Sequence, residues 1–396
     1  MRRILIINPF GIGDVLFTTP VIRAIKEKHP DSVIGYWCNE RVADLLKTNP
    51  DIDKAFPLSR GDIKRVYGGL KGADKGLKGI GRGLKGFAVL VNLIRAIRKE
   101  GFDTTFDFSL DSRYGLWSKL AGIKKRIGFD YKGRGRFLTD KIGLDGYSDK
   151  HVVEYYLDLL KFIGIKTSSP GLDAAYKGGT GRGCVSYNLY ISKENSAKAK
   201  SILTKHGIAS SDLIIGIAMG GGASWGKDAL YKHWPADKFA QLVDRLIKES
   251  NARVVLLGSI DEKPLAEIAS SRLNARSNRG GTRNDDNCIV NLTGKLDLEE
   301  LSAVIKELKI LVCNDGGPLH MAVALGVNTV SIFGPVDEKV YGPYPPGQKH
   351  VVIKKDLSCR PCYENFRFKG CSNNRQCLEG IAVDEVYQAT EKLLKN

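Results

Sequence analysis

Short apolar runs alternate with amphipathic stretches along most of the chain, and each change of period marks a predicted element. In the first half, residues 3–8 (RILIIN) have the pattern of a buried strand, and residues 14–28 have helical periodicity. Further predicted strands are 32–37 and 102–109, and further predicted helices are 40–48, 114–120 and 152–163. Apolar strands that alternate with helices indicate a parallel sheet covered on both faces.

The alternation stops at residues 167–183, which are rich in Ser, Gly and Pro and indicate a linker, and it resumes after them. Predicted strands in the second half are 213–219, 253–258, 310–313 and 329–333, and predicted helices are 235–249, 264–273, 298–307 and 319–325. The pattern therefore predicts a two-lobed α/β protein with its ligand in a cleft, outside the carboxyl ends of the strands.

A basic repeat interrupts this pattern in the first half. Gly-Leu-Lys-Gly occurs at 69–72, 76–79 and 83–86, and a helix there would place Leu84 and Phe87 on an apolar stripe. A basic amphipathic segment of this kind is typical of a membrane surface. Glycine costs a helix about 1 kcal/mol per residue, so the segment is also consistent with a solvated loop, or with a helix docked on its own domain.

Composition and charge narrow the classes of protein. The chain has 396 residues, 61 Lys and Arg against 44 Asp and Glu, and a formal net charge of +17. The 42% hydrophobic content excludes wholesale disorder, and the charge indicates an anionic partner. No apolar run approaches about 18 residues, and the first run is too short for a signal peptide. We therefore expect a cytosolic protein.

The eight cysteines fall into two groups. Three of the scattered residues Cys38, Cys184, Cys288 and Cys313 lie in or beside apolar runs, and this group indicates buried thiols. The other four form the cluster Cys359-x₂-Cys362-x₈-Cys371-x₅-Cys377. Its first half has good ligand spacing for a structural Zn²⁺, whereas its irregular second half favours free or redox-active thiols.

The turn Asn8-Pro9-Phe10-Gly11-Ile12-Gly13-Asp14 joins the first strand to its helix. It is not the dinucleotide fingerprint, because Leu16 stands where a third glycine is needed. A carboxylate also opposes phosphate binding there. Asp14 could act as a general base at the strand end or could cap the helix, and the motif alone does not decide.

Three further turns follow predicted strands in the second half. The loop at 220–227 (GGGASWGK) offers backbone donors, Ser224 and Lys227, and Lys232 comes shortly after it; together they suit a diphosphate. The turn at 314–320 (NDGGPLH) leaves a helix N-terminus open to an anion. The turn at 258–262 (GSIDE) carries a carboxylate for ribose hydroxyls or for helix capping.

Five segments together resemble the bacterial lipopolysaccharide heptosyltransferase family, glycosyltransferase family 9. They are RRILIINPFGIGDVLFTTPVIRAIKEKHP, GGGASWGKDALYKHWP, LTGKLDLEEL, NDGGPLHMAVALGVNTVSIFGP and the C-terminal cysteine cluster. The resemblance implies a GT-B fold of two Rossmann-like domains. Residues 1–175, with a basic insert at about 60–100, would bind the acceptor, residues 184–345 the nucleotide-sugar, and residues 346–396 would hold the cysteines and a terminal helix.

The resemblance also implies roles for single residues. Asp14 would be the general base of an inverting, metal-independent reaction, and Lys232 would stabilise the leaving diphosphate. The implied nucleotide-sugar contacts are Ser224, Lys227, Glu262, Leu296, Asp315, Gly316, Gly317 and His320. The implied acceptor contacts are Gly13, Arg60 and Lys64. The loop from Gly220 to Lys232 is longer than in typical members, so it stays open whether Lys227 or Lys232 meets the phosphates.

The resulting hypothesis is a glycosyltransferase that moves a sugar, heptose from ADP-heptose, onto an anionic, lipid-linked glycan of the lipopolysaccharide inner core. It would lie at the cytosolic face of the inner membrane, with no cofactor required for catalysis and no nucleic acid partner. The alternatives are a GT-B-like sugar-nucleotide epimerase or hydrolase, and a non-enzymatic basic protein that binds membrane or nucleic acid through residues 64–85. Sparse aromatic residues there argue against single-stranded nucleic acid.

Overall fold

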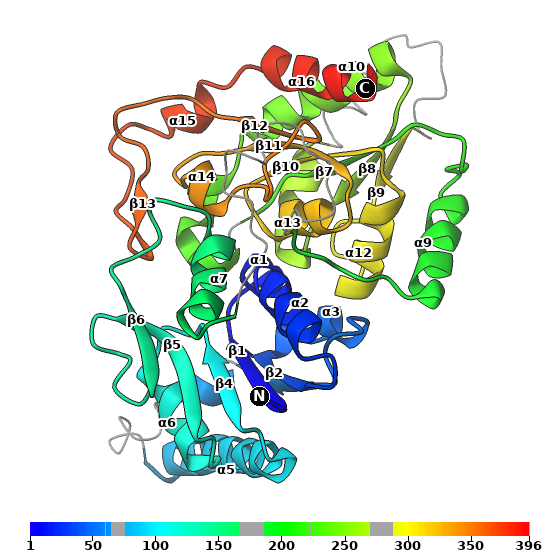
Figure 1. The fold of residues 1–396 in the computed structure, drawn as a ribbon. Coiled ribbons are helices and arrows are strands. Elements are labelled where there is room, and N and C mark those ends of the chain that lie inside the picture. Colours follow the sequence, from blue (N-terminus) through cyan, green and yellow to red (C-terminus); the bar gives the residue numbers. More distant parts are fainter. Residues whose placement is uncertain (60, 65–75, 166–185, 222, 270–287, 396) are drawn as a thin grey trace. The chain divides into compact units, whose positions relative to one another are not determined.

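Two compact units divide the chain (Figure 1). The computed structural model describes residues 1–59, 61–64, 76–165, 186–221, 223–269 and 288–395. Unit 1 comprises Met1–Tyr147 and Val152–Thr167, and unit 2 comprises Ser148–His151 and Ser168–Asn396. The predicted linker at 167–183 lies outside the described residues, as does Cys184.

Unit 1 contains a six-stranded parallel sheet in the order β3-β2-β1-β4-β5-β6. Its strands are β1 (Arg3–Asn8), β2 (Val33–Asn39), β3 (Lys54–Leu58), β4 (Thr104–Asp107), β5 (Lys125–Tyr131) and β6 (Asp140–Leu144). The central strand β1 is buried almost throughout, as expected of a strand covered on both faces. The sheet confirms the predicted α/β class for this half.

Helices cover this sheet. They are α1 (Ile12–Leu16), α2 (Thr19–Lys28), α3 (Asp44–Lys47), α5 (Gly76–Glu100), α6 (Ser112–Leu120) and α7 (Val152–Phe162), with the 3₁₀ turn η1 (Glu40–Val42) before α3. The single helix predicted over 14–28 is wrong, because the chain forms α1 and α2 there. Pro20 lies in the first turn of α2, where its missing N–H costs nothing.

The helix α5 contains the basic repeat. Its second half packs through Leu90 and Ile97 on the core of unit 1, with Leu93 and Ile94 partly buried beside them. Leu84 and Phe87, by contrast, are 64% and 56% exposed. The apolar stripe expected to include Leu84, Phe87 and Ile94 is therefore split between a docked end and an exposed stretch.

Unit 2 repeats the architecture with the sheet order β12-β11-β10-β7-β8-β9, again entirely parallel. Its strands are β7 (Ile214–Ala218), β8 (Arg253–Leu257), β9 (Ile289–Asn291), β10 (Ile310–Asn314), β11 (Asn328–Ile332) and β12 (His350–Ile353). Both sheets have one connectivity: the first three strands run outward from the centre, and the next three run outward on the other side. This is the Rossmann order.

The helices of unit 2 are α9 (Lys193–Lys205), η3 (Ala223–Lys232), α10 (Ala236–Ser250), η4 (Ile260–Glu262), α12 (Leu298–Glu307), α13 (Gly317–Ala324), α14 (Glu338–Tyr341), α15 (Gln376–Glu379) and α16 (Val383–Lys395). A further helix begins at residue 263, and its described part ends at 269. A short hairpin of β13 (Tyr363–Glu364) and β14 (Arg367–Phe368) precedes α15.

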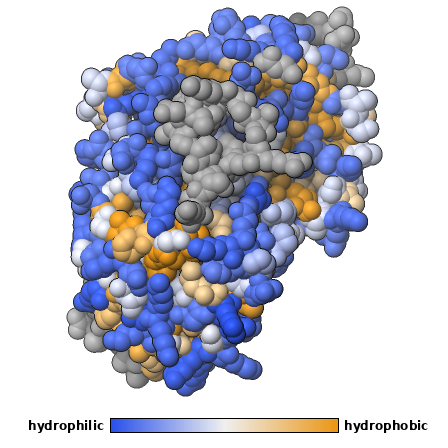
Figure 2. Space-filling view, viewed as in Figure 1, coloured by the Kyte–Doolittle hydropathy of each residue, from blue (hydrophilic) through white to orange (hydrophobic). Residues whose placement is uncertain are grey.

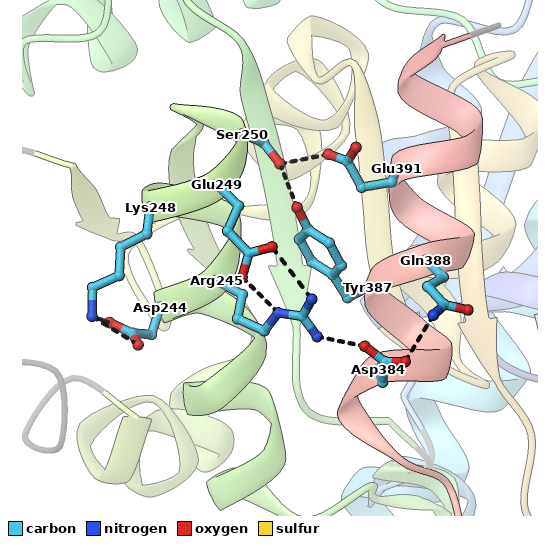
Figure 3. A network of polar contacts seen from close by, with 9 residues as sticks. All are labelled: Asp244, Arg245, Lys248, Glu249, Ser250, Asp384, Tyr387, Gln388 and Glu391. Atoms are coloured by element: carbon cyan, nitrogen blue, oxygen red, sulfur yellow. Dashed lines mark hydrogen bonds and ion pairs between the residues drawn. The ribbon is translucent and has the colours of Figure 1, made fainter.

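The terminal helix α16 is fixed against α10 by the polar network of Figure 3. The Arg245 guanidinium donates to Glu249 and to Asp384, and it lies 3.9 Å from the centre of the Tyr387 ring. Ser250 donates to Glu391 at 2.7 Å. Beneath this network α16 contributes Val386 and Leu393 to the core of unit 2, so the C-terminal segment is an integral part of this unit.

The visible surface is largely hydrophilic, with hydrophobic residues gathered in a few patches (Figure 2). Among the described residues, none of the helices combines the length and the apolar character that a bilayer crossing requires.

Candidate functional site

The predicted nucleotide-sugar residues gather at one edge of the sheet of unit 2. Residues 220–221 follow β7, Glu262 follows β8, Leu296 follows β9 and Asp315 follows β10. These four strands are neighbours in the order β10-β7-β8-β9. The order reverses between β7 and β10, and ligands of open α/β sheets bind outside the carboxyl ends at such a switch point.

The turn after β7 needs its two glycines. A Cβ on Gly220 would lie 1.8 Å from Oε1 of Glu262, and one on Gly221 would lie 2.8 Å from the carbonyl oxygen of Asp315. Gly221 also has φ +141, a value that L side chains rarely adopt. The glycines therefore let the turn pass between the loops that follow β8 and β10.

Glu262 holds this turn. Its Oε1 accepts a hydrogen bond from the N–H of Gly221 at 2.8 Å, and its Oε2 accepts one from the N–H of Ser259 at 2.7 Å. The carboxylate thus caps η4, one of the two roles that the sequence left open, and it also ties the β8 loop to the β7 loop. A role in ribose binding stays a prediction.

Asn314 joins the turn to β10. Its Nδ2 donates to the carbonyl of Met219 at 2.6 Å, and its Oδ1 accepts the N–H of Trp234 at 3.0 Å. His233 donates through Nε2 to the carbonyl of Gly221 at 2.7 Å. Both ends of the long loop from Gly220 to Lys232 are therefore fixed by side chains.

Lys232 and Asp315 form the charged centre of the site. The Lys232 Nζ lies 2.5 Å from Oδ2 of Asp315, and the two side chains are only 10% and 6% exposed. Lys227, in the same loop, is exposed. The structure thus distinguishes the two lysines that the sequence could not: Lys232 lies at the switch point, and Lys227 lies at the surface.

His320 lies in α13, directly after the turn that carries Asp315. Its ring is buried, and its Nδ1 is 3.3 Å from the Tyr187 hydroxyl. Burial and, to a smaller extent, the Lys232 charge together lower the pKa of His320 to about 3. The imidazole is therefore neutral at physiological pH, which suits hydrogen bonding rather than ion pairing.

The remaining predicted donor residues lie on the same loops. Gly316 is the N-cap of α13 and Gly317 its first residue, with no side-chain cap, so the first N–H groups of this helix have no partner within it. Leu296 is half-buried after β9. Ser224 belongs to η3, but its side chain lies outside the described residues.

In unit 1, Asp14 lies in the first turn of α1, after the central strand β1. Its Oδ2 accepts the N–H of Gly11 at 3.3 Å, and its carbonyl accepts Nδ2 of Asn8 at 2.9 Å. The carboxylate is half-buried. Asp14 therefore caps its helix, which is one of the two roles that the sequence left open. It also lies at the switch point between β1 and β4, where a general base at the strand end is expected.

Three buried tyrosines lie close enough to Asp14 to be affected by its charge. Burial raises the pKa of the Tyr36, Tyr147 and Tyr156 phenols well above the usual range, and the Asp14 carboxylate adds to this effect in all three. Gly13 lies beside Asp14 in α1 and is half-buried.

A second carboxyl group, which sequence reasoning missed, ends the neighbouring strand β4. Asp107 is buried, and its Oδ1 accepts the N–H of Ser109 at 2.9 Å. Burial raises its pKa from 3.8 to about 7. The signal in the sequence was present but weak: a single Asp in the apolar run of residues 102–109.

Sequence reasoning also missed three cations in the loop after β5. Lys132, Arg134 and Arg136 are exposed, and their described contacts include the faces of Tyr131 and Phe137. Among the salt bridges of the described residues, none involves these three. The alternation of Gly with basic residues in KGRGR was the available signal.

Two further predicted acceptor residues are Lys64 and Arg60. Lys64 is exposed at the end of the short helix 61–64, and Arg60 lies outside the described residues. Their part in acceptor binding stays a prediction.

The C-terminal cysteines lie close to one another. Burial and, to a smaller extent, the nearby Cys359, Cys377 and Cys371 together raise the pKa of Cys362 to about 11. All four are free thiols. Within the described residues, no group of three or more His, Cys, Asp or Glu side chains is arranged to hold a metal ion.

The scattered cysteines behave largely as expected. Cys38 and Cys313 are buried, and burial raises the pKa of Cys38 to about 12. Cys288 is only half-buried, because it directly precedes the edge strand β9, so its predicted burial is wrong.

Most of the chain matches the model of a known protein family. Residues 90–371 match glycosyltransferase family 9 (heptosyltransferase). Lipopolysaccharide heptosyltransferase 2 of Salmonella typhimurium is 24% identical over 334 residues, which are 84% of this chain and 83% of that protein.

Solved structures are similar along the whole chain. A family 9 glycosyltransferase from Veillonella parvula is similar with a TM-score of 0.75 and 23% identity, over 100% of this chain and 97% of that one. An E. coli heptosyltransferase with ADP-2-deoxy-2-fluoro heptose is similar with a TM-score of 0.65 and 18% identity, over 98% of this chain and 99% of that one. These likenesses confirm the predicted GT-B fold.

Proposed function

Because this chain belongs to glycosyltransferase family 9, the heptosyltransferase family, and is a glycosyltransferase, we propose that it transfers heptose from ADP-heptose to the lipopolysaccharide inner core or a related lipid-linked glycan. Relatives named as lipopolysaccharide heptosyltransferases support this choice of sugar and acceptor. The family excludes the non-enzymatic alternative, and the named relatives favour transfer over epimerisation or hydrolysis.

The main support for nucleotide-sugar binding by unit 2 is the buried pair of Lys232 and Asp315 at its switch point. A diphosphate that enters this edge meets the Lys232 ammonium and the free N–H groups of Gly316 and Gly317 at the start of α13. Ser224 and Lys227 supply further contacts from η3. Neutral His320 and half-buried Leu296 supply the hydrogen bond and the apolar contact that a nucleoside needs.

Asp14 is the general base of the proposal. It takes the proton from the acceptor hydroxyl as that oxygen attacks the anomeric carbon, while the bond from this carbon to the diphosphate breaks and ADP leaves. Attack opposite to the leaving group inverts the anomeric centre. Lys232 stabilises the negative charge that develops on the diphosphate, which is why we propose that the reaction needs no metal.

The anionic acceptor is assigned to unit 1. The exposed Lys132, Arg134 and Arg136 follow β5, two strands from the Asp14 turn in the same parallel sheet, and Gly13, Arg60 and Lys64 complete the proposed acceptor contacts. Guanidinium and ammonium groups suit the phosphates of such a glycan.

Membrane association is part of the same proposal. Leu84, Phe87 and Val89 of α5 are exposed by 64%, 56% and 43%, and Lys85 is exposed among them. Apolar side chains beside cations are the features that bind the surface of an anionic bilayer. We propose that α5 holds the enzyme at the cytosolic face of the inner membrane, where a lipid-linked acceptor is found.

The test is a binding screen of ADP-, UDP- and GDP-sugars, followed by transfer assays with truncated lipopolysaccharide. We expect ADP-heptose to bind and its sugar to appear on the acceptor with an inverted anomeric centre. Consumption of the donor at the same rate without any acceptor would instead identify an epimerase or hydrolase. Binding of only a UDP- or GDP-sugar would overturn the proposed donor.

A further inference from the structure

An aromatic cluster joins the donor loop η3 to the C-terminal hairpin. The Trp225 ring stacks on Tyr363 of β13, with the ring centres 5.0 Å apart and the planes at 24°. It also lies 5.0 Å from Phe368 of β14. Tyr363 and Phe368 are cross-strand partners in the hairpin, so they form one aromatic surface under Trp225.

The hairpin is itself fixed to the body of unit 2. The N–H groups of Cys362 and Tyr363 both donate to the carbonyl of Pro335, at 2.9 and 3.1 Å. From the same cysteine-containing segment, Arg375 donates to the carbonyl of Leu230 in η3 at 2.9 Å. The segment 346–396 therefore supports η3 at two separate places.

Trp225 in turn contacts the charged centre. The Lys232 Nζ lies 5.1 Å from the centre of the Trp225 ring, within the range of a cation–π interaction. The same ammonium is paired with Asp315. Lys232 is thus held by a carboxylate that neutralises its charge and by an indole that attracts the ammonium without neutralising it.

We propose that Trp225 is a positioning residue for Lys232. Seated on the hairpin, it keeps the ammonium at the switch point when a diphosphate competes with Asp315 for that charge. This inference rests on the role given to Lys232 in the proposed function, and it assigns the C-terminal hairpin a part in donor turnover.

Three variants separate positioning from packing. Trp225→Phe keeps an aromatic face, Trp225→Leu fills the space without one, and Tyr341→Ala removes a ring that contacts Tyr363 edge-on but belongs to α14. We expect Trp225→Leu to lower kcat about tenfold, with little change in KM for the nucleotide-sugar. Trp225→Phe should recover most of the rate, and Tyr341→Ala should leave the ratio of kcat to KM unchanged.

A mutant cycle tests whether Trp225 affects turnover through Lys232. Trp225→Leu is repeated in a Lys232→Ala/Asp315→Asn background, which leaves no unpaired carboxylate. If Trp225 acts through Lys232, its replacement costs no further rate there. An equal loss in both backgrounds, or a Trp225→Phe variant as slow as Trp225→Leu, overturns the inference. Full turnover in the background variant instead overturns the role of Lys232 in the proposed function.

Discussion

The Lys232 ammonium and the Asp315 carboxylate meet at 2.5 Å, although 83 positions of sequence separate them and each belongs to a different loop. Both loops lie at the point where the strand order of unit 2 reverses. The carboxylate pairs with the ammonium in a buried place, so in the proposed mechanism a cation is in position before a diphosphate arrives.

Breaking this pair should destabilise unit 2. Lys232→Ala leaves a buried carboxylate without its partner, which typically costs about 3–5 kcal/mol. Lys232→Met/Asp315→Leu replaces both charges with apolar groups and should recover much of the loss. Urea denaturation measures both free energies of unfolding. A double variant less stable than Lys232→Ala would contradict this account.

Gly220→Ala should weaken donor binding. The new methyl would lie 1.8 Å from the Glu262 carboxylate and would displace it from the N–H of Gly221. We expect at least a tenfold loss of ADP affinity by calorimetry, because a turn that has lost its hydrogen bond to Glu262 no longer holds its backbone donors toward the diphosphate, and each such bond contributes about 1–3 kcal/mol. Gly143→Ala is the matched control, because nothing lies within 4 Å of its Cβ.

Asp14→Asn should abolish transfer while ADP still binds. The amide preserves the cap on the N–H of Gly11 but cannot accept a proton, and general bases contribute about 10²–10⁴-fold. Transfer rate and ADP affinity are measured on the same sample. Asp31→Asn removes an exposed carboxylate of the same unit and should change neither. Undiminished turnover in Asp14→Asn would remove Asp14 from the mechanism.

Asp107 should make stability depend on pH. Its pKa is raised from 3.8 to about 7 by burial, so between these values the folded state holds a proton that the unfolded state has lost. Stability from this group therefore falls as pH rises through this window, by about 4 kcal/mol at most. Asp107→Asn should raise Tm at about pH 8 and have little effect at about pH 4. An equal change in Tm at both pH values would contradict the raised pKa of Asp107.

Leu84→Ser/Phe87→Ser should weaken binding to vesicles that contain anionic lipid. Each apolar side chain gives about 1.5–3 kcal/mol when fully buried, so we expect at least a tenfold loss in a sedimentation assay. Leu120→Ser/Phe162→Ser is the matched control, since these side chains are 56% and 52% exposed in the same unit. Equal losses in both pairs would indicate non-specific adhesion.

Every interior strand except β5 could be predicted, and the edge strands could not. β1, β7 and β10 are buried throughout or nearly so, and their apolar runs are visible in the sequence. The strands that were missed include all four sheet edges, β3, β6, β9 and β12. An edge strand faces solvent and carries polar residues or proline, as Pro57 in β3 shows, so its apolar run is short or interrupted.

The single turns of the candidate site could be predicted from the sequence, but the contacts between these turns could not. Each glycine-containing turn stood out beside its strand, but the contact of Glu262 with Gly221 and that of Lys232 with Asp315 depend on which strands become neighbours. Periodicity carries no information on strand order. Trp225 was visible within GGGASWGK, yet nothing local shows that residues 363 and 368 lie beneath it.

The identical connectivity of the two sheets places Asp14 and the Gly220-Gly221 turn at equivalent positions, each after the first strand of its unit. One position holds a carboxylate that repels phosphate, and the other holds glycines that admit it. In the proposed mechanism, unit 1 therefore determines which acceptor is used and unit 2 determines which donor is used. An exchange of unit 2 between relatives should change the nucleotide-sugar that is used and leave the acceptor that receives it the same.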